Sequence, residues 1–381
     1  MKKVLVIGML DSIHLARWLS QFEDQQINFV VFPSTKFRNV HPDLLNLINT
    51  NKNYRLSQKR FLSLYGYKEY FSNNVLNIIS AYFSSSLRLK RIIMKNNFDY
   101  IHAVEIQGAG YLLTDALQGE SFNKSKIIIT NWGSDIYFFE NKKIHKDKIQ
   151  STLKIADFYS AECHRDYELA LKNGFMGKFL PVNPNAGGFS VEVLQKNVKP
   201  SGDRSLIIAK CYGGLFGLGE IIIQAIDKYM SLNSTVSIFF YSVTTDLEQK
   251  IEKLMEKYPS RIDYCTVRNK LSILDMYEKF SNAKIYIGAS KSDGISTSFL
   301  EALVLGAYPI QTNTSCGSEW VDKGFNAHLV ETSTEAIIEA LLEVSRLSNL
   351  EEMRINNKVL AEKFLSYDSI KQESLLFYGL K

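Results

Sequence analysis

The stretch from 283 to 310, AKIYIGASKSDGISTSFLEALVLGAYPI, has the residue types needed to bind a phosphate group between two carboxylates. A short β-branched run ends at Gly288, a polar loop follows, and a helical pattern begins near Ser296. The first backbone N–H groups of a helix have no intrahelical acceptor, and with the helix dipole they favour an anion. The candidate ligand-binding residues here are Asp293, Gly294, Ser296, Thr297, Ser298 and Glu301. We expect Asp293 to act in catalysis as well.

A structural interpretation of the same residues is also open. Ser298 and Glu301 have the spacing of a capping box, which contributes about 1 kcal/mol to helix stability. Asp293-Gly294 is a favourable turn dipeptide. The spacing of these residues alone is equally compatible with both roles.

A second candidate phosphate site lies at 205–220, SLIIAKCYGGLFGLGE, where a strand, a glycine-rich loop and a helix are predicted in that order. Lys210 leaves the strand end as a point charge suited to phosphate, and we expect it to stabilise a leaving diphosphate. The glycines that allow close approach of a ligand are Gly213, Gly214, Gly217 and Gly219. The alternative is a flexible turn with a solvated lysine. No GxGxxG pattern occurs here or after the first predicted strand, which disfavours a Rossmann dehydrogenase.

The N-terminal half has polar residues at comparable strand ends, after the run 3–8 and within NWGSDIY (131–137). The candidates are Gly8 for donor binding, Asp11, Ser12, His14, His164 and Arg165 for the acceptor, and Asp135 for catalysis. Asp135 is expected to orient the acceptor or to accept its proton. The structural alternatives are a helix N-cap at Asp11 or Ser12, a turn at Asp135 and a buried structural histidine at position 14.

The elements that position these residues alternate between strand and helix periodicity. Strands are predicted at 3–8, 27–32, 126–130, 205–209, 235–241 and 283–288. Helices are predicted at 13–22, 41–49, 108–118, 163–173, 218–231, 244–257, 272–280, 297–305 and 333–347. This alternation predicts an α/β fold of two Rossmann-like domains, whose parallel sheets face a central cleft. The predicted parts are a domain at 1–185, a linker at 186–204, a domain at 205–365 and a C-terminal helix at 366–381 that packs back across the hinge.

The composition is that of an ordinary globular protein. The chain has 381 residues, of which 45% are hydrophobic and 22% are charged, so general disorder is excluded. No apolar run approaches the roughly 18–20 residues that span a bilayer, and the start MKKVLVIGML is interpreted as a buried strand rather than a signal peptide. The four cysteines include no CxxC pair, which argues against a structural zinc site. We expect no metal and a cytoplasmic location.

The net charge of +5 is unevenly distributed. Residues 36–96 carry eleven Lys and Arg against two acids, a net charge of +9, which leaves −4 for the rest of the chain. Aromatic residues lie between these cations from Tyr54 to Phe83. This composition predicts docking on an anionic membrane surface, the inner leaflet of the cell membrane. Two ordinary helices with solvated cations are the alternative, and nucleic acid is not expected because no binding module accompanies the patch.

The stretch KSDGISTSFLEALVLGAYPI resembles the donor-binding signature of retaining GT-B glycosyltransferases of family 4. In that signature two glutamates eight residues apart flank a phosphate-binding helix; Asp293 stands at the first and Glu301 at the second. Gly306 and Pro309 match the glycine and proline that follow, and 317–331 resembles a later segment of the family. The family places an arginine near Lys210 and a second lysine further along the loop, and this chain lacks the second cation.

The resemblance implies transfer of a sugar, with retention of configuration, from a nucleotide sugar to an acceptor hydroxyl. The first acid would approach the donor sugar, Glu301 would bind the ribose, and the helix amides would take the pyrophosphate. UDP is the expected nucleotide, and a saccharide or lipid-linked glycan is the expected acceptor, in cell-surface polysaccharide synthesis. No DxD motif occurs, so no metal cofactor is expected. A nucleotide-sugar 2-epimerase and a non-catalytic nucleotide-sugar binding protein remain as alternatives.

Overall fold

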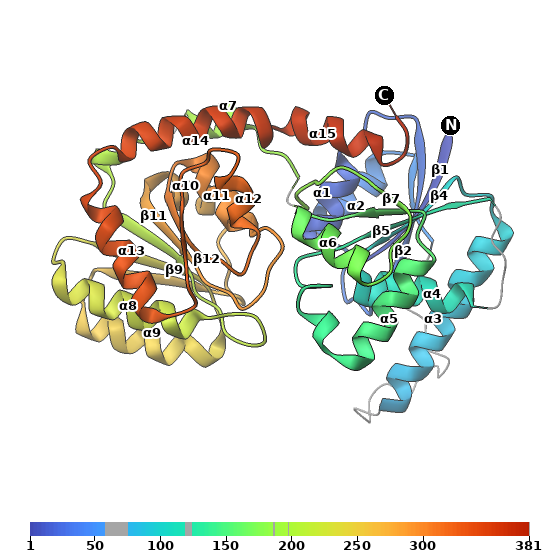
Figure 1. Ribbon diagram of the computed structural model, residues 1–381, viewed down its shortest axis with the longest axis horizontal. Coiled ribbons are helices and arrows are strands. Elements are labelled where there is room, and N and C mark those ends of the chain that lie inside the picture. The colour runs from blue at the N-terminus through green and yellow to red at the C-terminus, as the bar shows by residue number, and fades with distance from the viewer. Residues whose placement is uncertain (58–74, 119–123, 186, 197, 381) are drawn as a thin grey trace. The chain divides into compact units, whose positions relative to one another are not determined.

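The computed structural model describes residues 1–57, 75–118, 124–185, 187–196 and 198–380, with 75–83 described by their backbone only. The chain divides into two compact units, which Figure 1 shows with their elements labelled. Unit 1 comprises Met1–Gly187 and Lys371–Lys381, and unit 2 comprises Gly188–Ile370. The predicted linker 186–204 carries α7 (Val191–Gln195) and the short helix η3 (Ser201–Asp203), and it counts with unit 2 from Gly188 onward.

Unit 1 is built on a seven-stranded parallel sheet in the order β3-β2-β1-β4-β5-β6-β7. Its strands are β1 (Lys2–Gly8), β2 (Ile27–Pro33), β3 (Tyr54–Leu56), β4 (Tyr100–Val104), β5 (Lys126–Thr130), β6 (Phe158–Ser160) and β7 (Lys178–Phe179). Helices cover both faces, so most side chains of the central strands are apolar, with His102 on β4 and Thr130 on β5 as buried polar exceptions. The strand order reverses between β1 and β4, and ligands of such sheets bind at the carboxyl ends of the strands beside that point.

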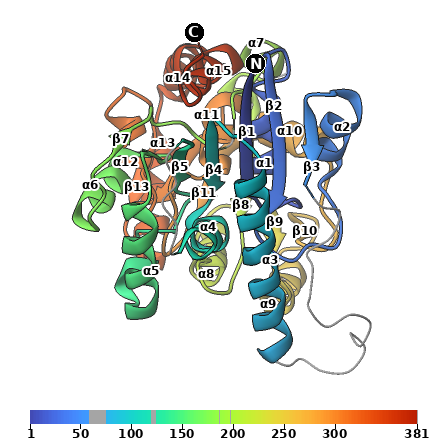
Figure 2. The same cartoon turned by 90° about the vertical axis from the view of Figure 1, so that its right-hand side faces the viewer.

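Alternate residues of these strands enter two cores. Leu5 and Ile7 of β1 face a core with α3 (Val75–Lys95), α4 (Tyr111–Leu117), α5 (Lys143–Lys154) and α6 (His164–Lys172). Val4 and Val6 face a core with α1 (Ile13–Ser20), α2 (Pro42–Thr50) and the end of α15 (Tyr367–Leu376). Figure 2 shows α3 and α4 side by side on the first face. The sheet is thus fixed from both sides, which makes its carboxyl edge a rigid support for loops.

Unit 2 repeats this plan with a six-stranded parallel sheet in the order β10-β9-β8-β11-β12-β13. Its strands are β8 (Leu206–Lys210), β9 (Ser237–Val243), β10 (Ile262–Thr266), β11 (Ala283–Gly288), β12 (Tyr308–Thr312) and β13 (His328–Val330). Helices α8 (Gly219–Leu232), α9 (Thr245–Lys257) and α13 (Thr334–Arg346) share a core on one face. Helices α10 (Ile273–Asn282) and α11 (Thr297–Leu305) contact the strands from the other, with α7 and α14 (Leu350–Phe364) packed on α11. The order reverses between β8 and β11, the strands that lead into the two predicted phosphate loops.

The C-terminal end of the chain is anchored in unit 1 by Tyr378, which is fully buried. Its hydroxyl lies 2.8 Å from Nδ1 of His102 on β4 and accepts a hydrogen bond of 3.2 Å from Nε1 of Trp18. Nε2 of His102 lies 2.6 Å from the hydroxyl of Thr130 at the end of β5. Burial lowers the pKa of His102 to about 3, so the imidazole is neutral at physiological pH. The unit boundary therefore falls within α15, whose residues from Lys371 onward count with unit 1.

Candidate functional site

The two predicted phosphate loops of unit 2 are joined by backbone contacts. Gly217 forms an isolated antiparallel bridge with Ser290, and the N–H of Lys291 donates to the carbonyl of Phe216 at 2.7 Å. The N–H of Leu218 donates to the carbonyl of Ala289 at 3.4 Å. The glycine-rich loop after β8 and the loop between β11 and α11 therefore form one continuous support at the carboxyl edge of the sheet.

Helix α11 begins two residues earlier than a capping box at Ser298 requires. Its N-cap is Ser296, and the N–H groups of Phe299 and Leu300 both donate to the Ser296 carbonyl, at 3.0 and 3.2 Å. Ser298 thus lies inside the first turn, and the capping-box interpretation of Ser298 with Glu301 is wrong. The N–H groups of Thr297 and Ser298 precede the first carbonyl that the helix can offer them. The start of α11 therefore presents two backbone donors that the helix itself does not satisfy.

The carboxylates of Asp293 and Glu301 both affect the pKa of the same buried phenol, that of Tyr286. Burial raises the pKa of Tyr286 on β11, and the carboxylates of Glu301 and Asp293 contribute to the rise. Burial and Asp293 likewise raise the pKa of Tyr212 in the glycine-rich loop. The Asp293 Oδ1 accepts a hydrogen bond of 2.9 Å from the N–H of Gly294, so the turn role predicted for this pair is present as well. Asp293 and Glu301 therefore both lie close enough to Tyr286 for their charges to affect it, and their shared role in binding stays a prediction.

Lys210 ends β8 beside Gly288, which ends β11. Its ammonium nitrogen lies 5.2 Å from the centre of the Tyr212 ring, a contact that keeps the charge over the glycine-rich loop. The charge of the Asp293 carboxylate in turn raises the pKa of Tyr212. The joined loops are therefore surrounded by the Lys210 ammonium, the Asp293 carboxylate and the open amides of α11.

The glycines of this loop have different constraints. Gly214 has a φ of +75°, which favours glycine, and it has open space where a Cβ would stand. A Cβ at Gly217 would lie 2.1 Å from the carbonyl oxygen of Tyr212, which is backbone. A Cβ at Gly213 would lie 2.2 Å from Oδ2 of Asp246, the end of an exposed side chain. Only the contact at Gly213 is relieved by a side-chain rotation, because the contact at Gly217 is with backbone.

We therefore expect Gly217→Ala to lower the free energy of unfolding of unit 2 by about 2 kcal/mol through a forced backbone shift. Gly213→Ala is the matched control and should cost clearly less, because Asp246 can turn away. Urea unfolding of both variants, followed by tryptophan fluorescence, measures the difference. Equal losses in the two variants would contradict this account of the loop.

In unit 1 the loop after β1 adopts the N-cap arrangement given as the alternative. The hydroxyl of Ser12 accepts a hydrogen bond of 3.2 Å from the N–H of His14, and Ser12 is the N-cap of α1. Nδ1 of His14 lies 3.3 Å from the carbonyl of Asn185, and its ring meets Trp132 edge-on at 5.6 Å between centroids. Asp11 is exposed. His14 is therefore brought next to the loop 131–137, while Ser12 has a structural role.

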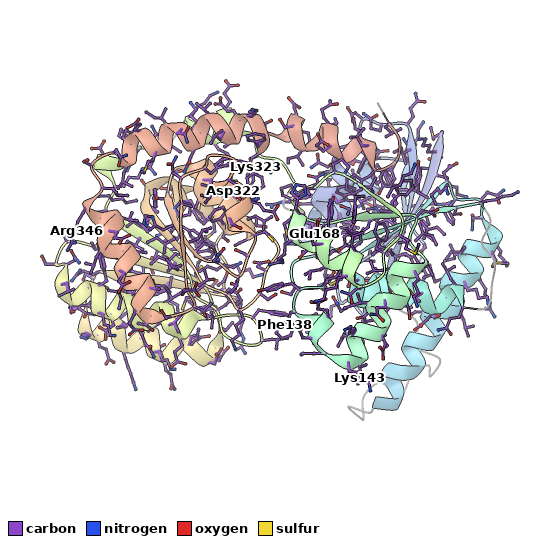
Figure 3. The ribbon with its side chains drawn as sticks, viewed as in Figure 1. Phe138, Lys143, Glu168, Asp322, Lys323 and Arg346 are labelled. Atoms are coloured by element: carbon purple, nitrogen blue, oxygen red, sulfur yellow. The ribbon has the colours of Figure 1, made fainter. Side chains whose placement is uncertain are left out.

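Gly8 and the pair His164 and Arg165 also have contacts within unit 1. A Cβ at Gly8 would lie 3.2 Å from both methyl groups of Leu15, so the glycine allows α1 to approach the end of β1. Nε of Arg165 pairs with Oδ1 of the buried Asp166 at 2.9 Å, and its guanidinium lies 3.9 Å from the centre of the Tyr137 ring. His164 begins α6 (Figure 3 labels the neighbouring Glu168 on this helix). These contacts give the three residues structural roles in the loop framework.

Asp135 is the most constrained of the predicted residues in unit 1. It is 9% exposed, and its Oδ2 accepts hydrogen bonds from the N–H groups of Ile106, at 2.8 Å, and Trp132, at 3.0 Å. Burial raises its pKa well above the ordinary range, and the charge of Glu105 adds to the rise. Glu105 directly follows β4 and was not predicted as a site residue. A polar residue at the end of an apolar run, YIHAVE (100–105), was the signal that could have pointed to it.

The chain resembles known proteins in part of its sequence and in its overall fold. Residues 3–158 match a family model described as glycosyl transferase 4-like. No curated protein matches the sequence. Solved structures, in contrast, superpose over nearly the full length of the chain.

A sucrose-phosphate synthase from Thermosynechococcus elongatus has a TM-score of 0.73 at 12% identity, over 99% of this chain and 98% of its own. HepE from Anabaena, in complex with UDP-glucose, has a TM-score of 0.69 at 12% identity, over 99% of both chains. A putative UDP-N-acetylglucosamine 2-epimerase from Listeria monocytogenes has a TM-score of 0.64 at 15% identity, over 98% of this chain and 94% of its own. The protein thus has the fold of GT-B glycosyltransferases, as the sequence predicted. Residues 3–158, which match the glycosyl transferase 4-like family model, lie within unit 1.

Proposed function

We propose that this protein is a retaining glycosyltransferase that moves a sugar from a nucleotide diphosphate sugar, with UDP as the nucleotide, to a hydroxyl of a saccharide or lipid-linked glycan. Its product would enter cell-surface polysaccharide or glycoconjugate synthesis. The observation that carries the proposal is the joining of the glycine-rich loop to the loop before α11. This contact gathers Lys210, two open amides and two carboxylates in unit 2. The family match over 3–158 and the neighbour that binds UDP-glucose support it.

In this proposal the leaving diphosphate is stabilised by fixed groups of unit 2. Breaking the glycosidic bond increases the negative charge on the diphosphate, and donors that are already in place lower the barrier. The N–H groups of Thr297 and Ser298 and the Lys210 ammonium would supply this stabilisation without a metal. Glu301 would hold the ribose hydroxyls and Asp293 would approach the sugar. Unit 1 would bind the acceptor near Asp135 and His14.

A binding screen followed by product analysis tests the proposal. A ligand that binds the folded state raises the apparent melting temperature, so UDP, GDP and ADP sugars can be ranked by thermal shift. The best donor is then incubated with saccharide and polyprenyl-linked acceptors, with and without EDTA, and the anomeric configuration of the product is determined by NMR. Transfer with retention that survives EDTA is expected. Binding without transfer to any acceptor would favour the non-catalytic alternative.

A nucleotide-sugar 2-epimerase is the second candidate, because the putative 2-epimerase from Listeria monocytogenes has a similar structure. An epimerase needs no acceptor. Incubation of UDP-N-acetylglucosamine alone therefore separates the two candidates. An epimerised nucleotide sugar would favour the second candidate, whereas an unchanged donor that is consumed only with an acceptor favours the first.

We also propose that the protein works in the cytoplasm, docked on the inner leaflet through the exposed side of α3. Leu87 and Met94 are 54% and 58% exposed, and Arg91 and Lys95 are exposed at helical spacing from them. Apolar and cationic side chains on one helix face suit an anionic headgroup layer. In the described part of the chain no helix is both long and apolar enough to cross a membrane. Lys59, Arg60 and Lys68 of the predicted basic segment, with the aromatic residues between 61 and 71, lie outside the described residues.

Reversing two charges on this face should weaken membrane binding. We expect Arg91→Glu with Lys95→Glu to lower partitioning onto phosphatidylglycerol vesicles by at least tenfold, at about 1 kcal/mol per cation near the surface. The control is Lys143→Glu with Lys146→Glu on α5, two exposed lysines of the same unit; Figure 3 labels Lys143. Co-sedimentation with phosphatidylglycerol and phosphatidylcholine vesicles measures both. Equal binding of the two double variants, or no dependence on anionic lipid, would remove the docking proposal.

A further inference from the structure

Glu105 adopts a backbone conformation that is unfavourable for a residue with a side chain. It follows β4 directly, with φ of 91° and ψ of 147°, in a region populated almost only by glycine. Such a conformation costs about 1–3 kcal/mol and persists only where the surroundings impose it. A glycine would remove this cost, so the glutamate side chain must contribute something that offsets it.

The Glu105 carboxylate holds the turn that follows β4. Its Oε2 accepts a hydrogen bond of 2.6 Å from the N–H of Gly108, and its Oε1 accepts one of 2.5 Å from the N–H of Ala109. These residues belong to a single π-helical turn, η1 (Ile106–Gly110). A Cβ at Gly108 would lie 2.5 Å from Oε1, so the glycine is needed for this contact. Glu105 thus fixes the position of the whole turn, including Ile106.

This π-helical turn holds Asp135 in place through hydrogen bonds. The N–H of Ile106 donates to Oδ2 of Asp135, and the side-chain amide of Gln107 donates to the Asp135 carbonyl at 2.8 Å. The second hydrogen bond to Oδ2 comes from Trp132. Both hydrogen bonds to the Asp135 carboxylate therefore end on Oδ2. In the described part of the chain, no hydrogen bond reaches Oδ1.

The charge of Glu105 also affects the ionisation of Asp135. Both are buried, at 5% exposure for Glu105 and 9% for Asp135. Burial raises the pKa of each carboxyl, and the charge of Glu105 raises the pKa of Asp135 further because like charges disfavour ionisation. The other groups that face Asp135 are Asp166, which adds to the rise, and the phenols of Tyr111 and Tyr159. Arg165 is paired with Asp166, so in the described part of the chain no cation is paired with Asp135 or Glu105.

We propose that Glu105 is a positioning residue that sets both the place and the charge of Asp135, the group that binds the acceptor hydroxyl. This inference rests on the proposed glycosyl transfer. Burial and the nearby charge of Glu105 disfavour the ionised form of Asp135, so its carboxyl is suited to meet a neutral hydroxyl at Oδ1. The arrangement suits an uncharged hydroxyl and is unfavourable for an anionic acceptor such as a sugar phosphate.

The test is the pH profile of kcat/KM for the acceptor in the wild type and in Glu105→Gln. Removing one negative charge lowers the pKa of Asp135, so the limb of the profile should move to lower pH by about one unit or more. We expect kcat/KM for the acceptor to fall by about 10-fold to 100-fold, because the turn loses one of its two hydrogen bonds to the carboxylate. The donor KM and the thermal shift caused by UDP should be unchanged, because the donor groups lie in unit 2.

Two further variants make the result specific. Glu105→Asp keeps the charge and should leave the limb near its wild-type pH while acceptor binding weakens. Glu162→Gln is the matched control, a buried carboxylate of unit 1 that also accepts two backbone hydrogen bonds, from Gly133 and Asn185. It should not move the limb. A limb that Glu105→Gln leaves in place, or that Glu162→Gln moves equally, overturns the inference.

The pH profile of the wild type tests the inference even where the variants fail to fold. The inference is overturned if the limb of the wild-type acceptor profile lies below about pH 5, within the ordinary carboxyl range. A protein that binds UDP but transfers to no acceptor would instead contradict the proposed function. The two failures are therefore distinguishable.

Discussion

Lys210→Ala is expected to lower kcat by about 100-fold to 1000-fold, with little change in the donor KM. Lys210 is the cation at the end of β8, and its charge lies over the loop that joins the start of α11. A fixed charge that meets a developing negative charge acts mainly in the transition state, and loss of one such donor has an effect of this size. The sequence has no second cation between Lys210 and α8, so little remains to compensate.

Initial-rate kinetics with the donor varied measure this effect. Lys228→Ala is the control, because Lys228 is an exposed lysine of the same unit that pairs with Glu335. Its kcat should be that of the wild type. Glu301→Ala should instead raise the donor KM, as expected of a residue that binds the ribose in ground state and transition state alike. Unchanged kinetics in folded Lys210→Ala would refute the proposed site.

Tyr378→Ala is expected to lower the free energy of unfolding of unit 1 by about 3–5 kcal/mol. The side chain is fully buried, and its ring lies 5.0 Å from that of Phe22 and 5.7 Å from that of Phe29 between centroids. Truncation leaves a cavity among aromatic rings. It also leaves His102 and Trp18 without the hydroxyl that they share.

Tyr378→Phe separates these two effects. It keeps the ring and removes only the hydroxyl, so we expect a loss of about 1–3 kcal/mol from the buried nitrogens left unpaired. Urea unfolding followed by far-UV circular dichroism measures both variants against the wild type. If Tyr378→Ala unfolds at the wild-type midpoint, the C-terminal residues do not stabilise unit 1.

The order of the elements and the position of the loops after β8 and β11 were predictable because strong local patterns specify them. Runs such as KVLVIG and AKIYIG are too apolar for anything but buried strands, and they became β1 and β11. The spacing of Asp293 and Glu301 around a helix start placed both near one strand end, and the charges of both raise the pKa of Tyr286. Local sequence works here because each group lies within a few residues of a strand end.

The acid pair of unit 1 was only half predicted because its geometry is not local. Asp135 stood out in NWGSDIY, but Glu105 lies 30 residues earlier and follows a strand that includes the polar His102. That histidine is buried only because Tyr378 and Thr130 satisfy it from distant parts of the chain. A positive φ at a glutamate has no sequence signal. The helix start near Ser296 was predicted, and only the capping-box alternative at Ser298 was excluded by which carbonyl the first amides reached.

Unit 1 is interrupted in the sequence by unit 2, since its last residues follow Ile370. During translation, domains generally fold as units in the order in which they leave the ribosome. Here the buried rings of Phe377 and Tyr378, which pack in unit 1, are synthesised only after all of unit 2 has been made. The nascent protein therefore cannot complete its first unit before the second has been synthesised, and a chain cut between the two segments lacks these rings even when its remaining residues are intact.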